Sequence, residues 1–460
     1  MNKLSLSKNP EAKEFYSSLV KIVAPIAGQN LITAAVSSAD VIMLGSVSQT
    51  AIAAASLAGQ IQFILFMFFT GLSSGMIMLS AQYWGKKDLN SIRTLLGIAL
   101  RISFVVGLVF AIASIFAPEF LMRLYTNEQP LIEQGAIYLR TVGFAYLVMP
   151  VSQIFQATLK SVEKVKTVTI ITIVALSTNI LLNAIFIYGW FGIPKMGIFG
   201  VALATLIARI LEAVLCVTYA STRKDVSFNL GCFFRFNKIL TKDFYKYSLP
   251  ALGNELVWGT AFSVYSVILG HLGEDIVAAN SVVNVVKNLA TVLCFGMSYG
   301  GAIILGKQMG AGNLEVAERN ASRLVKTTIL SGVLGSIFFI LCRPLLPFIA
   351  ELSPTATYYT KYLLYINAAS IIGAAVNTVL ICGVFRAGGD AKFGFIADTI
   401  SMWCVSVPLG LLAAFVFKLP PLWVYFVLFL DEFEKMPVII HHYFKKTWLR
   451  DITNSQINSQ

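Results

Sequence analysis

Residues 37–57, SSADVIMLGSVSQTAIAAASL, recur in outline 225 positions later as residues 262–282, FSVYSVILGHLGEDIVAANSV. Matched positions continue on both sides of this stretch, at an offset that becomes 226 after one extra residue. They are Gly45 with Gly270, Ala53-Ala54 with Ala278-Ala279, Pro25 with Pro250, Gly85 with Gly310, Gly107 with Gly332, Lys160 with Arg386, and Lys166 with Lys392. Two homologous membrane halves are typical of a pseudo-symmetric transporter, whose central cavity opens to either side of the membrane in turn.

The composition independently indicates a membrane protein. The 460 residues are 57% hydrophobic and 13% charged, whereas a soluble domain carries about 25% charged residues. This balance excludes an ordinary soluble enzyme. About 20 apolar residues cross a bilayer as a helix, so the sequence predicts an all-α integral membrane protein with twelve transmembrane helices, six in each of two pseudo-symmetric lobes. The predicted spans are 20–44, 51–72, 94–116, 133–157, 167–189, 197–220, 247–269, 276–300, 325–350, 362–384, 393–416 and 421–444.

The longest polar break divides the predicted lobes. We assign residues 1–225 to the first lobe with helices one to six, 226–246 to a cytoplasmic linker, and 247–460 to the second lobe with helices seven to twelve. Parallel repeats of six helices begin on the same side of the membrane, so their axis runs along the membrane normal. We therefore expect substrate to bind between the lobes.

The distribution of Lys and Arg predicts the orientation, because short loops rich in these residues stay in the cytoplasm. One side carries most of them, including Lys86, Lys87, Lys160, Lys164, Arg235, Lys307, Arg319, Arg386, Lys445 and Lys446. The opposite loops carry only Arg123, Lys195, Arg343, Lys361 and Lys418. This predicts a multi-pass protein of the cytoplasmic membrane, with both termini in the cytoplasm.

The net charge of +12 needs no nucleic-acid partner. It follows from the positive-inside bias and favours contact with anionic lipid headgroups. The polar start MNKLSLSKNPEAKEF leads into a span too long for a cleaved signal. The six cysteines show no CxxC spacing, so we expect neither a disulfide framework nor a zinc site. We expect a monomer.

The first candidate site lies in the outer half of the first lobe. Asp40 is five residues before Gly45, and Asn179 and Asn183 share one face of helix five because they are four residues apart. Carboxylate and amide oxygens are ligands for a hard cation such as Na⁺, and a half-desolvated carboxylate could instead carry a proton. No other metal and no cofactor is implied. The alternative is that Asp40 lies at the outer surface and the two amides only join helices.

The second lobe does not duplicate this cluster. The repeat partners of Asp40, Asn179 and Asn183 are Tyr265, Val405 and Leu409. A single coupling site in the first lobe is therefore the simpler interpretation.

A charge pair is the candidate in the second lobe. Glu255 and Lys287 both fall roughly 20 Å from the outer face by helical rise, so they could pair across adjacent helices. Such a pair is either structural or part of a cavity that meets substrate or a proton.

Other charges in the spans are predicted to be structural or solvated. Arg209 with Glu212, and Asp431 with Lys435, are spaced to neutralise each other on one helix. Three further residues, Asp398, His441 and His442, fall near the cytoplasmic ends of helices, where we expect contact with water. Glu432 and Glu434 have no evident partner.

Pro25 and Pro250 lie early in the first helix of each lobe. Each removes a backbone hydrogen bond and favours a bend, which could reposition Asp40. A static kink filled by packing is the alternative.

The sequence lacks the motifs of the common enzyme classes, among them the P-loop, HExxH and the nucleophile elbow. We therefore expect a transporter driven by an ion gradient rather than an enzyme. An ion channel would need rings of identical residues around a pore, and the two unlike lobes argue against one.

Six segments carry a resemblance to the multidrug and toxic compound extrusion (MATE) transporters. They are SSADVIMLGSVSQTAIAAASL (37–57), NILLNAIFIYG (179–189), MGIFGVALATLIARILE (196–212), HLGEDIVAANSV (271–282), VFRAGGDAKF (384–393) and FKKTW (444–448). The resemblance covers essentially the whole chain. It implies twelve helices in two lobes and export of amphipathic, often cationic, compounds in exchange for Na⁺ or H⁺.

Site residues follow from this resemblance position by position. Asp40, Asn179 and Asn183 match the family's ion site in the first lobe. In members that use carboxylates of the second lobe, the helix-seven Glu lies about one turn from the position of Glu255, and an Asp stands where this chain has Ala375. The other function considered is a flippase for lipid-linked oligosaccharide or another lipid, which would show a strongly cationic cavity. Here the deep cations Arg209, Lys287 and Lys435 each have a possible acidic partner, which favours the exporter.

Overall fold

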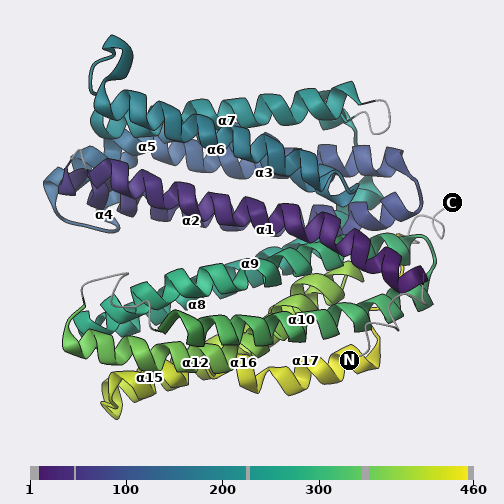
Figure 1. The fold of residues 1–460 in the computed structure, drawn as a ribbon. Coiled ribbons are helices and arrows are strands. Elements are labelled where there is room, and N and C mark those ends of the chain that lie inside the picture. The colour runs from purple at the N-terminus through teal and green to yellow at the C-terminus, as the bar shows by residue number, and fades with distance from the viewer. Residues whose placement is uncertain (1–9, 46–47, 224–227, 344–351, 454–460) are drawn as a thin grey trace. The chain divides into compact units, whose positions relative to one another are not determined.

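The computed structural model describes residues 10–45, 48–223, 228–343 and 352–453 (Figure 1). These residues form helices joined by short turns, and the described part of the chain contains no strand. Within a bilayer, a helix pairs all of its backbone polar groups internally, whereas strands can do so only as a closed barrel. The prediction of an all-α membrane fold is therefore confirmed.

The described part of the first half forms seven α-helices and, between the last two, the short 3₁₀ helix η2 (Trp190–Gly192). The α-helices are α1 (Pro10–Gly45), α2 (Gln49–Gly85), α3 (Leu89–Phe116), α4 (Pro118–Arg123), α5 (Gln129–Ser161), α6 (Val165–Tyr188) and α7 (Gly197–Thr222). Local signals place their ends. Asp88 accepts a hydrogen bond from the Ser91 backbone at the start of α3, and Gly189 adopts a left-handed conformation (φ 75°) that ends α6.

The second half is more segmented. Its elements are η3 (Leu230–Phe234), α8 (Lys238–Gly270), α9 (Glu274–Gly310), α10 (Leu314–Cys342), α12 (Pro354–Thr378), η5 (Val379–Phe385), α13 (Ala391–Asp398), η6 (Thr399–Ser406), α14 (Val407–Leu411), η7 (Leu412–Val416), α15 (Pro421–Leu428), α16 (Asp431–Glu434) and α17 (Met436–Lys445). Elements η5, η6 and η7 are π-helical turns within longer helical rods. The predicted linker 226–246 contains η3 and the first turns of α8.

Every predicted span overlaps one of these helical segments. Within the residues that the structure describes, nine helical segments are long and apolar enough to cross a membrane. The three remaining predicted spans fall on α1, on α8 and on the series from α15 to α17. The count of twelve crossings stays a prediction, as do the bends at Pro25 and Pro250, which both lie inside continuous helices.

Contacts divide the chain into two compact units. The first unit comprises residues 28–80 and 87–248, and the second comprises residues 1–27, 81–86 and 249–460. Each has its own packed core, with Leu139 and Tyr146 fully buried in the first unit and Phe339 and Tyr425 in the second. Close packing of this kind, rather than hydrophobic exclusion from water, holds helices together in lipid. The predicted lobe limits at residues 225 and 247 stay predictions.

Glycines matched by the repeat allow a close crossing in the second unit. A side chain at Gly85, at the end of α2, would collide with the Lys307 carbonyl of α9, and one at Gly310 would collide with the Gln82 backbone. Each glycine therefore lies against the backbone of the helix that carries the other glycine. Small residues permit such approaches between membrane helices.

The segment after α17 closes over the end of α2. The buried Gln82 amide donates to the carbonyl of Ala387 at 2.8 Å and accepts from the Ile452 backbone at 2.8 Å. Lys86 pairs with Asp451 at 2.9 Å. Arg450 donates to the carbonyls of Gly388 and Gly389 in the turn before α13. Residues 448–453 thus join the end of α2 to the turn before α13 within the second unit.

Candidate functional site

A stripe of buried polar side chains runs along α6 in the first unit. Thr169, Thr172, Asn179 and Asn183 are all buried. Their spacing places them close to one face of the helix. Buried amides and hydroxyls in a membrane helix need hydrogen-bond partners from neighbouring helices.

These partners come from two helices of the same unit. Asn179 Nδ2 lies 3.5 Å from the Thr205 hydroxyl of α7, and Asn183 Nδ2 donates to Asn179 Oδ1 at 3.4 Å. Gln29 of α1 donates to the Thr172 hydroxyl at 3.2 Å. The structure therefore brings Asn179 and Asn183 together, as predicted. It also shows Asn179 in the interhelical contact that was the alternative interpretation.

A cavity of about 150 Å³ adjoins this stripe. Its polar lining residues come from α1, α2, α5, α6 and α7, and are Thr33, Gln62, Tyr138, Asn179, Thr205 and Arg209. Arg209 is held by the buried Glu212 at 2.9 Å, and Glu212 also accepts from Gln156 at 2.9 Å. The predicted pair Arg209 and Glu212 is confirmed, and the cation at the edge of the cavity is neutralised.

The side chain of Asp40 lies outside the described residues. Its backbone belongs to α1. Val36, one turn earlier in the same helix, lines the cavity. The contact of Asp40 with the two amides stays a prediction.

A larger hollow of about 610 Å³ lies elsewhere in the first unit, among the ends of helices. Its lining includes Thr50, Glu133, Lys195 and Gly197. It shares no lining residue with the small cavity beside Asn179, so we do not assign the coupling site to it.

In the second unit the predicted pair of Glu255 and Lys287 is wrong. Arg386 donates to Glu255 at 2.9 Å and to the Asn254 side chain at 2.6 Å. The ammonium of Lys287 instead lies 4.4 Å from the centre of the Phe429 ring and 5.1 Å from that of Phe262. A cation over aromatic faces is stabilised by the ring quadrupoles. The spacing argument placed both residues at a suitable depth but could not show that a nearer guanidinium takes the carboxylate.

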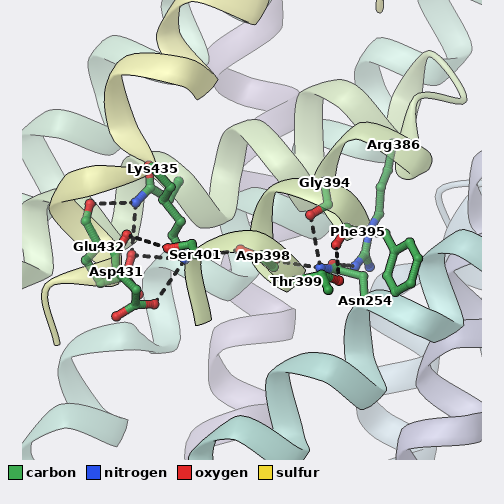
Figure 2. A network of polar contacts seen from close by, with 11 residues as sticks. Asn254, Arg386, Gly394, Phe395, Asp398, Thr399, Ser401, Asp431, Glu432 and Lys435 are labelled. Atoms are coloured by element: carbon green, nitrogen blue, oxygen red, sulfur yellow. Dashed lines mark hydrogen bonds and ion pairs between the residues drawn. The ribbon is translucent and has the colours of Figure 1, made fainter. Parts of the chain in front are cut away.

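A continuous polar network extends from Arg386 towards the helices α16 and α17 (Figure 2). Asn254 bridges Arg386 to Asp398, donating to the Asp398 carboxylate at 2.6 Å. Lys435 then contacts Asp398 at 3.2 Å and Asp431 at 3.4 Å. The predicted pair of Asp431 and Lys435 is confirmed within this larger network.

Two predictions about single charges are corrected here. Asp398 is buried rather than solvated, because Asn254 and Lys435 supply partners for both of its oxygens. Glu432, for which the sequence offered no partner, lies 3.6 Å from Lys435 and accepts from Asn377 at 2.9 Å. Glu434 is exposed.

Three members of the network escaped sequence reasoning. Asn254 and Asn377 carry no charge and fall within apolar spans, while Arg386 fits a basic cytoplasmic turn. Arg386 is nevertheless only 4% exposed. The one signal in the sequence for Arg386 was its match to Lys160 in the repeat. This match marks a basic residue present in both halves, but it does not indicate what Arg386 contacts.

No described group of three or more His, Cys, Asp and Glu side chains is arranged to hold a metal ion. The side chains of Asn179 and Asn183 supply amide oxygens in the first unit of the kind that can coordinate a monovalent cation. Asn179 Oδ1 is occupied by Asn183, so a cation that used it would displace this hydrogen bond.

The chain has two homologous halves of apolar helices, and each half holds buried polar groups near its core. This arrangement is typical of membrane transporters built from internal repeats. The MatE family model matches residues 25–185 and 250–412. The chain therefore belongs to the multidrug and toxic compound extrusion family, as the resemblance implied.

Relatives and solved structures agree with this assignment. The chain is 24% identical to the uncharacterized transporter YisQ of Bacillus subtilis, with 96% of this chain and 97% of YisQ covered. It is 26% identical to the multidrug resistance protein NorM of Vibrio cholerae, with 86% of this chain and 87% of NorM covered. The fold matches an outward-facing multidrug resistance MATE transporter with a TM-score of 0.84, at 17% identity and with 96% of each chain covered.

Proposed function

We propose that this protein is a secondary antiporter that exports amphipathic, cationic drugs or toxic compounds in exchange for Na⁺ or H⁺ by alternating access. Membership of a multidrug-efflux family supports the substrate class. The observation that carries the coupling site is the buried pair Asn179 and Asn183 beside a small polar cavity. We assign coupling to Asp40 with these two amides.

The remaining features of the proposal follow the sequence. The protein works in the cytoplasmic membrane, with both termini on the cytoplasmic side and with membrane lipid around it. It acts as a monomer, needs no nucleic acid and no cofactor beyond the coupling ion, and catalyses no covalent reaction. The positive-inside bias supports the orientation.

The carboxylate partners of the deep cations favour an exporter over a lipid flippase. A site for a pyrophosphate headgroup would need several uncompensated cations. Among the deep cations that the structure describes, Arg209, Arg386 and Lys435 are held by carboxylates, whereas Lys287 lies over two aromatic rings. A lone cation is poorly matched to a multiply charged headgroup.

Reconstitution in liposomes tests the proposal. Efflux of a fluorescent cationic dye is measured under an imposed Na⁺ gradient and, separately, an imposed H⁺ gradient, for wild type and Asp40→Asn. We expect one gradient to drive efflux and Asp40→Asn to abolish the driven part, because the amide cannot carry the charge that couples the two fluxes.

The matched control is Glu128→Gln, which removes an exposed carboxylate in the same unit. It should transport as wild type does. Driven efflux that survives Asp40→Asn would move coupling away from the first unit, and the absence of dye movement under either gradient would contradict the exporter.

A further inference from the structure

Three carboxylates of the second unit surround one buried ammonium group. The Lys435 Nζ lies 3.2 Å from Asp398, 3.4 Å from Asp431 and 3.6 Å from Glu432 (Figure 2). The side chains of Lys435 and Asp431 are 6% and 3% exposed. One ammonium cannot balance three ionised carboxylates, so charge compensation must come from elsewhere.

The wider surroundings leave this imbalance in place. Arg386 pairs with Glu255, and Lys287 lies over the Phe429 ring, two residues before Asp431. The phenols of Tyr265 and Tyr299 are neutral. Four carboxylates therefore face three cations even when every charged group of the network is counted. They are Glu255, Asp398, Asp431 and Glu432 against Lys287, Arg386 and Lys435.

An uncompensated charge inside a membrane span costs several kcal/mol or more, and the usual response of a buried carboxylate is to take up a proton. We propose that Asp431 and Glu432 share one bound proton, which makes α16 a proton site of the second unit that is separate from the Asp40 region. Two adjacent carboxyl groups near one cation bind protons as a pair rather than as independent sites.

The hydrogen bonds indicate why the proton is on this pair rather than on Asp398. Asp398 accepts from Asn254 at one oxygen and from Lys435 at the other, so both of its oxygens already act as hydrogen-bond acceptors. Asp431 and Glu432 are held more loosely, at the two longer distances from Lys435.

An unpartnered amide oxygen supports the assignment independently. Asn377 is 1% exposed, and its Nδ2 donates to both the carbonyl and the carboxylate of Glu432 at 2.9 Å. Its Oδ1 accepts no hydrogen bond from the described residues. A buried acceptor without a donor is costly, and a protonated carboxyl group supplies an O–H donor of the kind that Asn377 lacks.

The repeat shows that the fold does not require these carboxylates. At the offsets of 225 and 226, Asn254 and Asp398 correspond to Gln29 and Thr172. The first unit makes the corresponding contact, since Gln29 donates to Thr172 at 3.2 Å just as Asn254 donates to Asp398 at 2.6 Å. The same register relates Asp431, Glu432 and Lys435 to Thr205, Leu206 and Arg209. Uncharged residues thus stand in the first unit where the second unit has its three carboxylates, while the basic residue is kept as Arg209.

Glu432 provides the route by which the proton can exchange. Its side chain is 14% exposed, against 3% for Asp431. The bound proton does not depend on the proposed function, whereas its use in drug export would rest on that function. Its detection therefore needs a measurement that involves no transport.

Infrared spectroscopy of the full chain in detergent makes this measurement. The C=O stretch of a protonated carboxyl group, identified by its shift in D₂O, is recorded at neutral pH for wild type, Asp431→Asn and Glu432→Gln. We expect this network to contribute one protonated group in wild type, and its band to be lost in both variants because removing one carboxylate restores the balance of charge. Replacing a neighbouring exposed carboxylate with Glu434→Gln should leave the band unchanged.

Lys435→Met gives an opposite expectation. Removing the ammonium makes the network more negative by one charge, so the number of protonated carboxyl groups should rise from one to two. Variants are compared only where they remain monodisperse and unfold cooperatively. Absence of the band in wild type at neutral pH, or a band that persists unchanged in both Asp431→Asn and Glu432→Gln, would overturn the proposal.

Discussion

Arg386 shows how far a single residue can lie from its expected environment. Its position in a basic turn predicted contact with the cytoplasm, yet the side chain is buried and bonded to Glu255 and Asn254. The long arginine side chain reaches back from the turn into the unit, and sequence spacing does not reveal its direction. The same limit applies to Lys287, whose depth was predicted but whose aromatic partners are distant in sequence.

Arg386→Met should destabilise the protein by about 3–5 kcal/mol, because breaking a buried ion pair leaves Glu255 charged and uncompensated. The measurement is the unfolding temperature of the purified protein in detergent. The double variant Arg386→Met with Glu255→Gln should recover part of this loss. Arg140→Met, which removes an exposed partner of Glu119, should have little effect. A double variant as unstable as the sum of both single changes would contradict the pairing.

Glu11 gives a pH dependence outside the membrane spans. Hydrogen bonds from Arg319 and then Arg323 lower the pKa of this carboxyl group below its ordinary value of 4.5. The folded state therefore gains stability above that ordinary value and loses it as the pH falls through the lowered pKa. We expect Glu11→Gln to reduce the unfolding temperature slightly at pH 7 and to match wild type in strong acid. A constant difference at every pH would exclude this origin.

At the scale of helices, the repeat matched glycines of the two halves without indicating what they contact. Gly85 and Gly310 match in the sequence, and the structure shows that each lies against the backbone of the other's helix. Span positions were well predicted because long apolar runs carry a strong signal. The segmentation after residue 378 was not, since π-helical turns depend on local packing rather than on composition.

Gly85→Ala and Gly310→Ala should each destabilise the second unit by roughly 1–3 kcal/mol, the typical cost of overpacking. Gly59→Ala is the matched control, because it lies in the same helix as Gly85 with no atom near its added methyl group. It should be neutral or more stable by up to about 1 kcal/mol. Thermal unfolding in detergent separates these cases, and equal effects at Gly59 and Gly85 would contradict the close crossing.

Across the whole molecule, the two halves share an architecture and differ in where charge is placed. The sequence shows that Asn179 and Asn183 have apolar repeat partners, and a single coupling site in the first half stays a prediction. It missed the larger network of the second unit, because Asn254, Asn377 and Arg386 become meaningful only when helices distant in sequence meet. Charge positions can be predicted from an apolar background, whereas their pairing requires the tertiary structure.

Asn179→Val, which installs the side chain of the repeat partner, should lower gradient-driven efflux by about tenfold or more. An Asn179 ligand that contributes ~1.4 kcal/mol to binding of the coupling ion raises the dissociation constant of that ion tenfold when it is removed. Val405→Ala changes the matched position of the second unit and should leave the driven efflux near wild type. The measurement is dye efflux from liposomes over a range of ion gradients. A higher ion requirement in Asn179→Val would identify weakened binding, and equal effects at both positions would contradict coupling in one half.

The bridge formed by residues 448–453 bears on the order in which the protein is made. The second unit unites residues near the start of the chain, the end of α2 and everything after residue 248. Gln82 finds its partners at Ala387 and Ile452, which leave the ribosome hundreds of residues after it. All residues of the first unit precede residue 249 and can pack while synthesis continues. Until residue 452 emerges, Gln82 lacks its final contacts, and the nascent chain depends on lipid, the insertion machinery or chaperones to shield that end of α2.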